Sequence, residues 1–421
     1  MRFKTLMRAL LVLPVFISVC PASMAETMES AMPSTTLLFE NDRFSAYRQN
    51  RHFIVSLKQP HRVLSTSDIN GGEQKDLDYL VNFQSVEGNG HDTRFKEILH
   101  LSNEQYHQEL AATLNLDSNK MASMGTAANI NNLVHVQKRF REITIDTFVT
   151  AGVKGNALRA GDPTHWYQSE NGNEYIPLDK QADSDEQVIH KNAGTINIIL
   201  LLNRTLLPGA QAKVATLIAE AKSAALAELA IPSKQSKHIA TGTGTDQYAI
   251  ASPISSSMKA LDSASGHLKL GELIGSAVRE AVFEAIGLES NLEPAQTRSV
   301  IHALSRFGAS EEAILSRLQE QLGEESYLLL LNNKRAALTE AKLVAASYAY
   351  AAVLDRLQYD TLSKHVQNDV LLDQAANAAV ALSGKSQSWQ LFRSKLAVDQ
   401  NDLLNVFLDA IALGWDAKWQ Q

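Results

Sequence analysis

Cysteine is almost absent from this sequence, since Cys20 is the one cysteine in 421 residues. It lies in an N-terminal segment that we expect to be removed. The mature chain is therefore expected to form no disulfide and to offer neither a thiolate nucleophile nor a sulfur ligand for a metal. Its stability must come from an apolar core, which a chain of this length can bury.

The sequence also has fewer basic than acidic residues. The chain carries 39 Lys and Arg against 46 Asp and Glu, a formal net charge of -7, and no long basic run. Nucleic-acid binding needs a basic face to neutralise phosphates, so a nucleic-acid partner is not expected. With 45% hydrophobic and 20% charged residues, the composition is that of a soluble globular protein.

Long hydrophobic runs are missing except near the start of the chain. Residues 9–19 are apolar and follow three basic residues, but the run is too short to span a bilayer comfortably. Ser23 and Ala25 are the small residues that a signal peptidase recognises. The pattern predicts a signal peptide over residues 1–25, a periplasmic location and no membrane span after cleavage. An uncleaved anchor is the alternative.

From residue 37 to residue 288, short β-like runs alternate with helical patterns. Apolar stripes at helical spacing predict two helices, at 210–229 and 270–286. The runs rich in β-branched and aromatic residues predict strands. These runs are 51–57, 62–66, 143–153, 195–202 and 248–252. We expect an α/β or α+β domain at 37–289, with helices packed on a mixed sheet.

The remainder, residues 290–421, is predicted to be an all-α domain. Helical stripes cover 310–323, 338–358 and 401–419, the first with Ser310 as its N-cap. These residues contain no glycine-rich loop and no metal-ligand spacing, so the sequence indicates no role for this domain.

The stretch "HIATGTGTDQYAIASP" (238–253) has the most unusual pattern. It lacks the Gly-Lys-Ser/Thr of a P-loop and the third glycine of a dinucleotide-binding fingerprint. One interpretation is a structural turn. The other is a ligand-binding loop, in which glycines let backbone N–H groups approach a ligand while side-chain oxygens contact it. The residues of this predicted loop are Thr241, Gly242, Thr243, Gly244, Thr245 and Asp246.

Four further segments combine small and polar residues at predicted strand ends. They are "LSTSDINGG" (64–72), "TAGVKGNALRAGDP" (150–163), "GTINIILLLN" (194–203) and "SGHLKLGELIG" (265–275). In this order and spacing, the chain resembles the adenosylcobinamide amidohydrolase family over about residues 37–288. The resemblance implies hydrolysis of the amide that joins the aminopropanol arm to the corrin ring, with release of adenosylcobyric acid. Cobalt would then enter only as part of the corrinoid substrate.

Amide hydrolysis without cysteine requires water or a Ser/Thr hydroxyl as the nucleophile. His267 is the predicted general base, because the dipole of the helix that follows would lower its pKa. Lys269 and Glu272 flank it, and Asp246 could orient a histidine or bind an amide. These four residues form the predicted catalytic set. The alternatives are a histidine at a helix entrance, a solvated surface acid and a turn cap.

Substrate binding is predicted for polar residues and glycines in the other segments. A buried Asn must find hydrogen-bond partners, so Asn197 is either a core bracket or a site residue. Trp166 and Tyr167 offer flat apolar faces to a macrocycle, or are simply packed in a loop. Besides the loop at 241–245, the predicted substrate-binding residues are Asn70, Gly71, Gly72, Asn156, Asp162, Thr195 and Asn197.

Two functions follow as hypotheses. The first is an exported corrinoid amidohydrolase in cobalamin salvage, which uses no metal ion of its own. The second is a non-catalytic periplasmic corrinoid-binding protein that assists an uptake system. The titratable set favours the enzyme, because a binding protein has no need of it.

Overall fold

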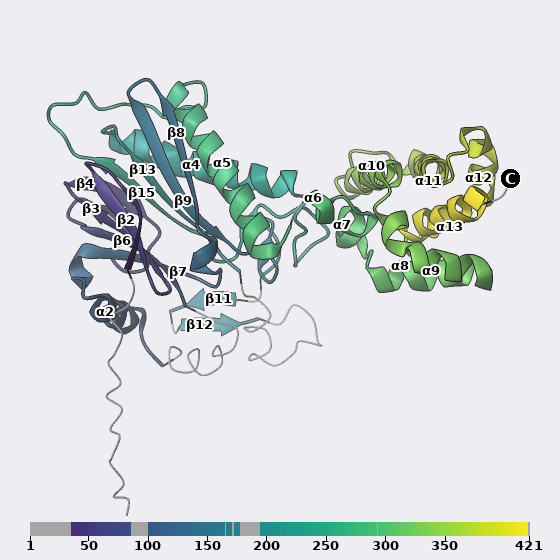
Figure 1. Cartoon of the computed structure of the whole chain (residues 1–421), viewed down its shortest axis with the longest axis horizontal. Helices are drawn as coiled ribbons and strands as arrows, with labels where there is room; N and C mark the ends of the chain where they lie inside the picture. The colour runs from purple at the N-terminus through teal and green to yellow at the C-terminus, as the bar shows by residue number, and fades with distance from the viewer. Residues whose placement is uncertain are drawn as a thin grey trace, which may run out of the picture. The chain divides into compact units, whose positions relative to one another are not determined.

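A five-stranded sheet contains the first strands that the structure describes (Figure 1). This computed structural model describes residues 35–85, 100–164, 166–170, 172–176, 194–292 and 294–419, so the predicted signal peptide lies outside the described residues. In spatial order the strands are β1 (Thr35–Glu40), β2 (Phe44–Gln49), β3 (His52–Leu57), β6 (Tyr79–Gln84) and β7 (Met121–Thr126). β7 pairs in parallel with β6 and is an edge strand.

A six-stranded sheet follows with mixed strand directions. β13 and β15 are parallel, and the other neighbours are antiparallel. In spatial order the strands are β5 (Gly72–Gln74), β4 (His61–Ser65), β15 (Gln247–Pro253), β13 (Ile196–Leu202), β9 (Ile143–Ala151) and β8 (Val134–Phe140). Two short pairs complete the strands: β10 (Ala157–Leu158) with β14 (Gly242–Thr243), and β11 (Trp166–Ser169) with β12 (Gly172–Tyr175).

The two sheets pack face to face. Successive residues of a strand point to opposite faces, so β13 divides its side chains between two cores. Ile199 and Leu201 join the cluster between the sheets, where the rings of Phe53 and Phe148 lie 4.9 Å apart. The predicted mixed sheet is confirmed, but the second sheet was not predicted.

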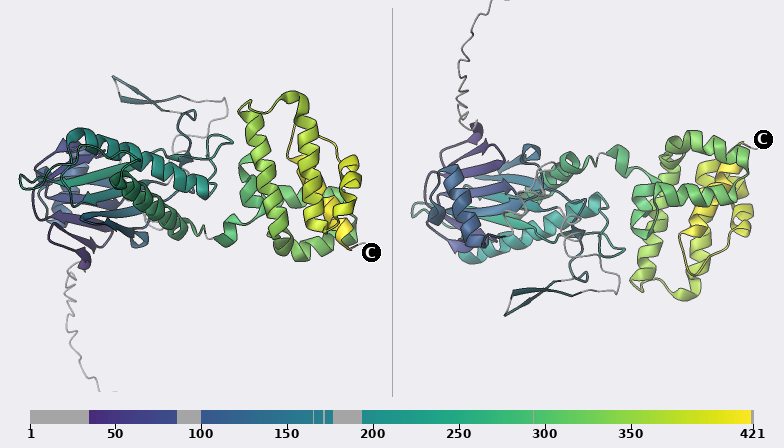
Figure 2. Two further views of the ribbon diagram at one scale, coloured as in Figure 1. Left: turned by 90° about the horizontal axis from the view of Figure 1, so that it is seen from above. Right: turned by 90° about the horizontal axis from the view of Figure 1, so that it is seen from below.

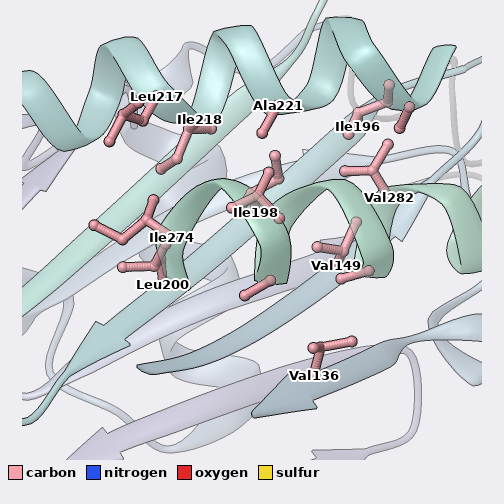
Figure 3. Packing of buried hydrophobic residues seen from close by; sticks show 14 of the residues in the cluster. Val136, Val149, Ile196, Ile198, Leu200, Leu217, Ile218, Ala221, Ile274 and Val282 are labelled. Carbon is pink, nitrogen blue, oxygen red and sulfur yellow. The ribbon is translucent and has the colours of Figure 1, made fainter. Parts of the chain in front are cut away.

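Helices α4 (Pro208–Glu228) and α5 (Lys269–Ser290) cover the other face of the six-stranded sheet. Ile198 and Leu200 of β13 belong to the same apolar cluster as Ile218 of α4 and Ile274 of α5, and Figure 3 shows these side chains. Both helices were predicted from their apolar stripes. Pro208 occupies the first turn of α4, where the missing N–H costs no hydrogen bond.

Helix α2 (Asn103–Leu114) covers the outer face of the five-stranded sheet. A capping box begins it, in which Ser102 Oγ accepts from the Gln105 N–H and the Gln105 side chain accepts from the Ser102 N–H. Leu110 and Leu114 pack against the apolar residues of β3 and β6. The resulting order of layers is α2, five-stranded sheet, six-stranded sheet, then α4 with α5 (Figure 2).

The C-terminal part is helical, as predicted, and has its own core. Gly414 of α13 (Asn405–Trp419) approaches α11 (Gln367–Ser383) so closely that a Cβ would overlap the Ala379 carbonyl. The Ser310 cap is confirmed by its bond from the Ala313 N–H. The helices are α6 (Pro294–Thr297), α7 (Val300–Leu304), α8 (Glu311–Gln321), α9 (Glu324–Leu338), α10 (Ala341–Gln358), α11 (Gln367–Ser383), α12 (Trp389–Lys395) and α13 (Asn405–Trp419).

A search of the described residues for a helix of the length and hydropathy needed to cross a membrane finds none.

Candidate functional site

A cavity of about 520 Å³ lies where β6 and β7 end and β15 begins. Its walls come from segments far apart in the sequence, including α2 and the turn after β4. Hydroxyl, amide and carboxylate groups line it together with aromatic rings. The lining residues are Thr66, Asp68, Ile69, Phe83, Ser85, Asn103, Tyr106, His107, Ser123, Gly125, Thr245, Asp246 and Gln247.

Ser123 and His107 form a hydrogen-bonded pair in this wall. Ser123 is on β7, and its Oγ lies 2.9 Å from Nδ1 of His107 on α2. His107 is 3% exposed, and its Nε2 lies 2.9 Å from the Ser118 carbonyl oxygen. A carbonyl only accepts, so Nε2 carries a proton and donates it. Both ring nitrogens are thereby held in place.

The turn that follows β4 braces the free edge of β7. Ser67 Oγ donates to the Ser123 carbonyl and accepts from the Ser123 N–H. Asn70 Nδ2 donates to the carbonyls of Met121 and Ser118, at 2.8 Å each. Gly71 closes the turn, because a Cβ there would overlap the Ser67 carbonyl. The segment "LSTSDINGG" therefore positions the strand that carries Ser123.

Gly72, the last residue of that segment, has a φ of +72°, a conformation that glycine adopts without strain. The backbone thus requires glycine at this position, and the structure gives it no contact with the cavity.

Asn197 bridges the two sheets behind the cavity. Its Nδ2 donates to Asn82 Oδ1 and to the Gly125 carbonyl, both at 2.9 Å. Asn82 in turn donates to Thr150 Oγ1 of β9. Asn197 is 1% exposed and does not line the cavity. It therefore links core segments by hydrogen bonds, which was one of the two interpretations that the sequence allowed.

Asp246 is held by four donors. Its Oδ1 accepts from the Ile196 N–H and Thr243 Oγ1, at 3.0 and 2.5 Å. Its Oδ2 accepts from the Thr243 N–H and is ion-paired with Lys222 of α4. With both oxygens engaged, the carboxylate ties the loop to β13 and α4. It is poorly placed to take a proton from a nucleophile.

The predicted glycine-threonine loop is largely a structural turn. A Cβ on Gly242 would overlap the Asp246 carboxylate and the Lys222 ammonium, and one on Gly244 would press on Asn156. The glycines therefore make room for this network. Of the loop, Thr245 reaches the cavity wall, next to Asp246.

Thr245 also joins two other predicted residues. Its Oγ1 lies 2.6 Å from Thr195 Oγ1 and donates to the Gly194 carbonyl at 3.1 Å. Asn156 Nδ2 donates to the same carbonyl at 3.0 Å. Segments 150–163, 194–203 and 238–253, three of those that carry the resemblance, therefore converge beside the cavity.

Asp162 caps a neighbouring turn. Burial raises the pKa of Asp162, but hydrogen bonds from Ser233 Oγ and the Arg159 N–H outweigh it and leave the pKa below its usual value. Thr241 Oγ1 accepts from the Ala160 N–H in the same turn. Both residues have structural partners, and neither lines the cavity.

His267, Lys269 and Glu272 lie at the opposite end of the six-stranded sheet. Lys269 Nζ pairs with Glu272 and lies 5.0 Å from the ring centroid of Phe140, the last residue of β8. The first residue of β8, Val134, is the one at the cavity end. β8 is seven residues long, so its two ends lie about 20 Å apart. The structure therefore does not bring these three residues together with Asp246.

Trp166 and Tyr167 are 46% and 54% exposed on the β11–β12 hairpin. They do not line the cavity. A contact with a macrocycle stays a prediction for them.

Ser123 and His107 were missed by the sequence analysis. His107 could have been singled out from the sequence, because it is a polar residue on the same helical face as Leu110, Ala111 and Leu114, which are buried in α2. Its partner on β7 is set by tertiary packing. Among the described residues no group of three or more His, Cys, Asp or Glu could hold a metal ion. Metal-independent hydrolysis stays a prediction.

Comparisons with known proteins find a relative of similar sequence and solved structures with low similarity scores. An uncharacterized protein of Methanocaldococcus jannaschii is 31% identical over 239 residues, which cover 56% of this chain and 86% of that protein. A Pyrococcus horikoshii protein of known crystal structure gives a TM-score of 0.26 at 12% identity, covering 60% of this chain and 81% of its own.

A Burkholderia sp. beta-aminopeptidase gives a TM-score of 0.25 at 14% identity, covering 62% of this chain and 84% of its own. The family match is more specific, because the sequence model of adenosylcobinamide amidohydrolase matches residues 36–294, a span that contains the whole cavity. The chain belongs to the adenosylcobinamide amidohydrolase family.

Proposed function

We propose that this protein hydrolyses the amide between the aminopropanol arm and the corrin ring of cobinamide or adenosylcobinamide. The products are cobyric acid, or its adenosyl form, and 1-aminopropan-2-ol. The observation that carries the proposal is the family match over residues 36–294. The cavity supports it, because hydroxyl and amide groups line a space that contains a hydrogen-bonded serine and histidine.

The size of the cavity suits the arm rather than the whole substrate. A volume of about 520 Å³ is that of a site for a small ligand, and the corrin ring with its side chains is larger. The aminopropanol arm and the scissile amide would enter, while the ring stays at the mouth. Thr66, Asn103 and Thr245 offer polar groups to the amides of the arm.

Export belongs to the proposal and is supported by the sequence of the first 25 residues alone. A periplasmic enzyme would meet corrinoids before their uptake across the inner membrane, and an uptake system would be its partner. Sequencing the N-terminus of protein from the periplasmic fraction tests this. Glu26 is the expected first residue, and an intact Met1 in the cytoplasmic fraction would contradict export.

The activity is tested by incubating the purified mature chain with cobinamide, with and without the adenosyl ligand, and analysing the products by mass spectrometry. Cobyric acid and 1-aminopropan-2-ol are expected. Ser85→Trp, which fills the cavity, should lose the activity. Ser256→Trp, at an exposed position beyond the far end of β15, is the matched control. Tight binding of cobinamide without any product would contradict hydrolysis and favour a binding protein.

A further inference from the structure

The hydrogen bonds of His107 determine which of its nitrogens is the base. Nε2 donates to the Ser118 carbonyl, so in the neutral ring Nδ1 has no proton and accepts. The atom 2.9 Å from Nδ1 is Ser123 Oγ, which must then be the donor. The hydroxyl proton of Ser123 therefore points at a lone pair that can remove it. A serine nucleophile needs this arrangement of base and orienting group.

Three other hydroxyls that line the cavity, those of Thr66, Ser85 and Thr245, have backbone partners instead. Ser85 Oγ donates to the Thr126 carbonyl and Thr245 Oγ1 to the Gly194 carbonyl. Thr66 Oγ1 accepts from the Tyr248 N–H and contacts the Tyr248 carbonyl. Within the described part of the chain, these contacts are with backbone groups, and none is with a side-chain base that could take the hydroxyl proton. Ser123 is distinguished from them by His107.

We infer that hydrolysis proceeds through a covalent ester on Ser123, with His107 as the general base. This inference rests on the proposed function. Ser123 Oγ attacks the amide carbonyl carbon while its proton passes to His107 Nδ1. The C–N bond then breaks, and the imidazolium gives that proton to the departing amine. The corrinoid carboxyl is left esterified to Ser123, and 1-aminopropan-2-ol leaves.

Water completes the cycle. It attacks the ester carbonyl while His107 Nδ1 takes its proton, the C–O bond to Ser123 breaks, and the proton returns to Ser123 Oγ. The carboxylic acid of the product then ionises. No oxidant, reductant or cofactor enters either half of the reaction.

The edge of β7 also offers a donor to the negative oxygen of the tetrahedral intermediate. In a parallel pair, alternate residues turn their backbone groups to the same side. Ser123 turns its N–H toward Ser67 and Gly125 turns its carbonyl toward Asn197, both on the edge away from β6. The Gly125 N–H faces the same way, at a residue that lines the cavity. It is the backbone donor that this edge offers to the oxyanion.

Side-chain hydrogen bonds hold the backbone of β7 in place. Ser67 and Asn70 hold Ser123 and Met121, and Asn197 holds Gly125. These are positioning residues, because they act on the strand and do not touch the reacting atoms. Their hydrogen bonds keep the nucleophile within reach of His107 without motion of the strand.

The test uses the mature full-length protein and cobinamide. Wild-type enzyme with neutral hydroxylamine should give the hydroxamate of cobyric acid together with the acid, because hydroxylamine intercepts the ester. Ser123→Ala should lower kcat by about 10³-fold or more with the dissociation constant for cobinamide little changed. Ser123→Cys should accumulate a thioester, seen by intact-protein mass as the added cobyric acyl group. Ser256→Ala is the control, since Ser256 is exposed beyond the opposite end of β15.

His107→Ala provides a second, independent measurement. Its turnover should fall by at least about 10²-fold, and added imidazole should restore part of it. Wild-type turnover that is retained in Ser123→Ala, with no hydroxamate, would overturn the serine mechanism and leave the proposed function intact. A wild-type enzyme that binds cobinamide and never cleaves it would overturn the proposed function as well.

Discussion

Removing the charge of Lys222 should loosen the sheet beside the cavity. The Lys222 and Asp246 side chains are only 16% and 12% exposed, and Asp246 also accepts from Thr243 and Ile196. Removing one partner of a buried ion pair lowers the free energy of unfolding by about 3–5 kcal/mol. Because both side chains keep some contact with water, we expect a loss of about 3 kcal/mol, at the lower end of this range, for Lys222→Met.

Hydrogen exchange followed by mass spectrometry is the suitable assay. Three of the four tryptophans, at 389, 415 and 419, lie in the helical part, so fluorescence would mainly report on that part. Peptides from β13 and β15 report the opening of the sheet directly. Lys222→Met and Asp246→Asn should each lower the free energy of opening of the six-stranded sheet. In the double variant this free energy should fall by about 2 kcal/mol less than the sum of the two single losses. Small, additive effects would refute the ion-pair account.

Further predictions concern packing, pH, domain independence and metals. Gly242→Ala should lower the melting temperature because its Cβ overlaps the carboxylate network, whereas Gly275→Ala in α5 meets no atom within 4 Å and should be neutral or stabilising; equal effects would contradict this. Burial lowers the pKa of His61, so below about pH 6.5 the unfolded state binds more protons and the free energy of unfolding falls as the pH drops. His61→Gln should weaken that pH dependence in urea titrations at pH 5 and 8, and an unchanged slope would contradict it. A chain ending at residue 293 should fold and cleave cobinamide, because the core at 134–292 shares no residue with the helical core; a folded fragment that binds but does not cleave would contradict this. Dialysis against a chelator should leave turnover unchanged, and a loss reversed by zinc would contradict metal independence.

Local patterns in the sequence predicted some of the elements, but not β6, β7 and α2, which line the cavity. The β-branched runs of β9 and β13 and the apolar stripes of α4 and α5 are found where they were expected. Long-range pairing was not visible. The division of the strands into two sheets depends on which side of each strand meets which layer, and one chain's periodicity does not encode that.

The same limit explains the outcome for the candidate site. Asn197 was recognisable as a buried amide that needs partners, and the structure supplies Asn82 and the Gly125 carbonyl. His267 attracted interest through its place before a helix. Only the register of β8 with β9 reveals that this helix begins at the end of the sheet away from the cavity. Ser123 and His107 belong to no recognisable spacing, because packing of α2 on β7 brings them together.

The position of the general base is tested by comparing two histidine variants, His107→Ala and His267→Ala, in steady-state hydrolysis of cobinamide. With the general base in the cavity, His107→Ala should lose at least about 10²-fold in kcat and recover with imidazole, while His267→Ala should stay near the wild-type rate. The reverse result, with turnover lost in His267→Ala and kept in His107→Ala, would place the chemistry at the start of α5 and contradict the site described here.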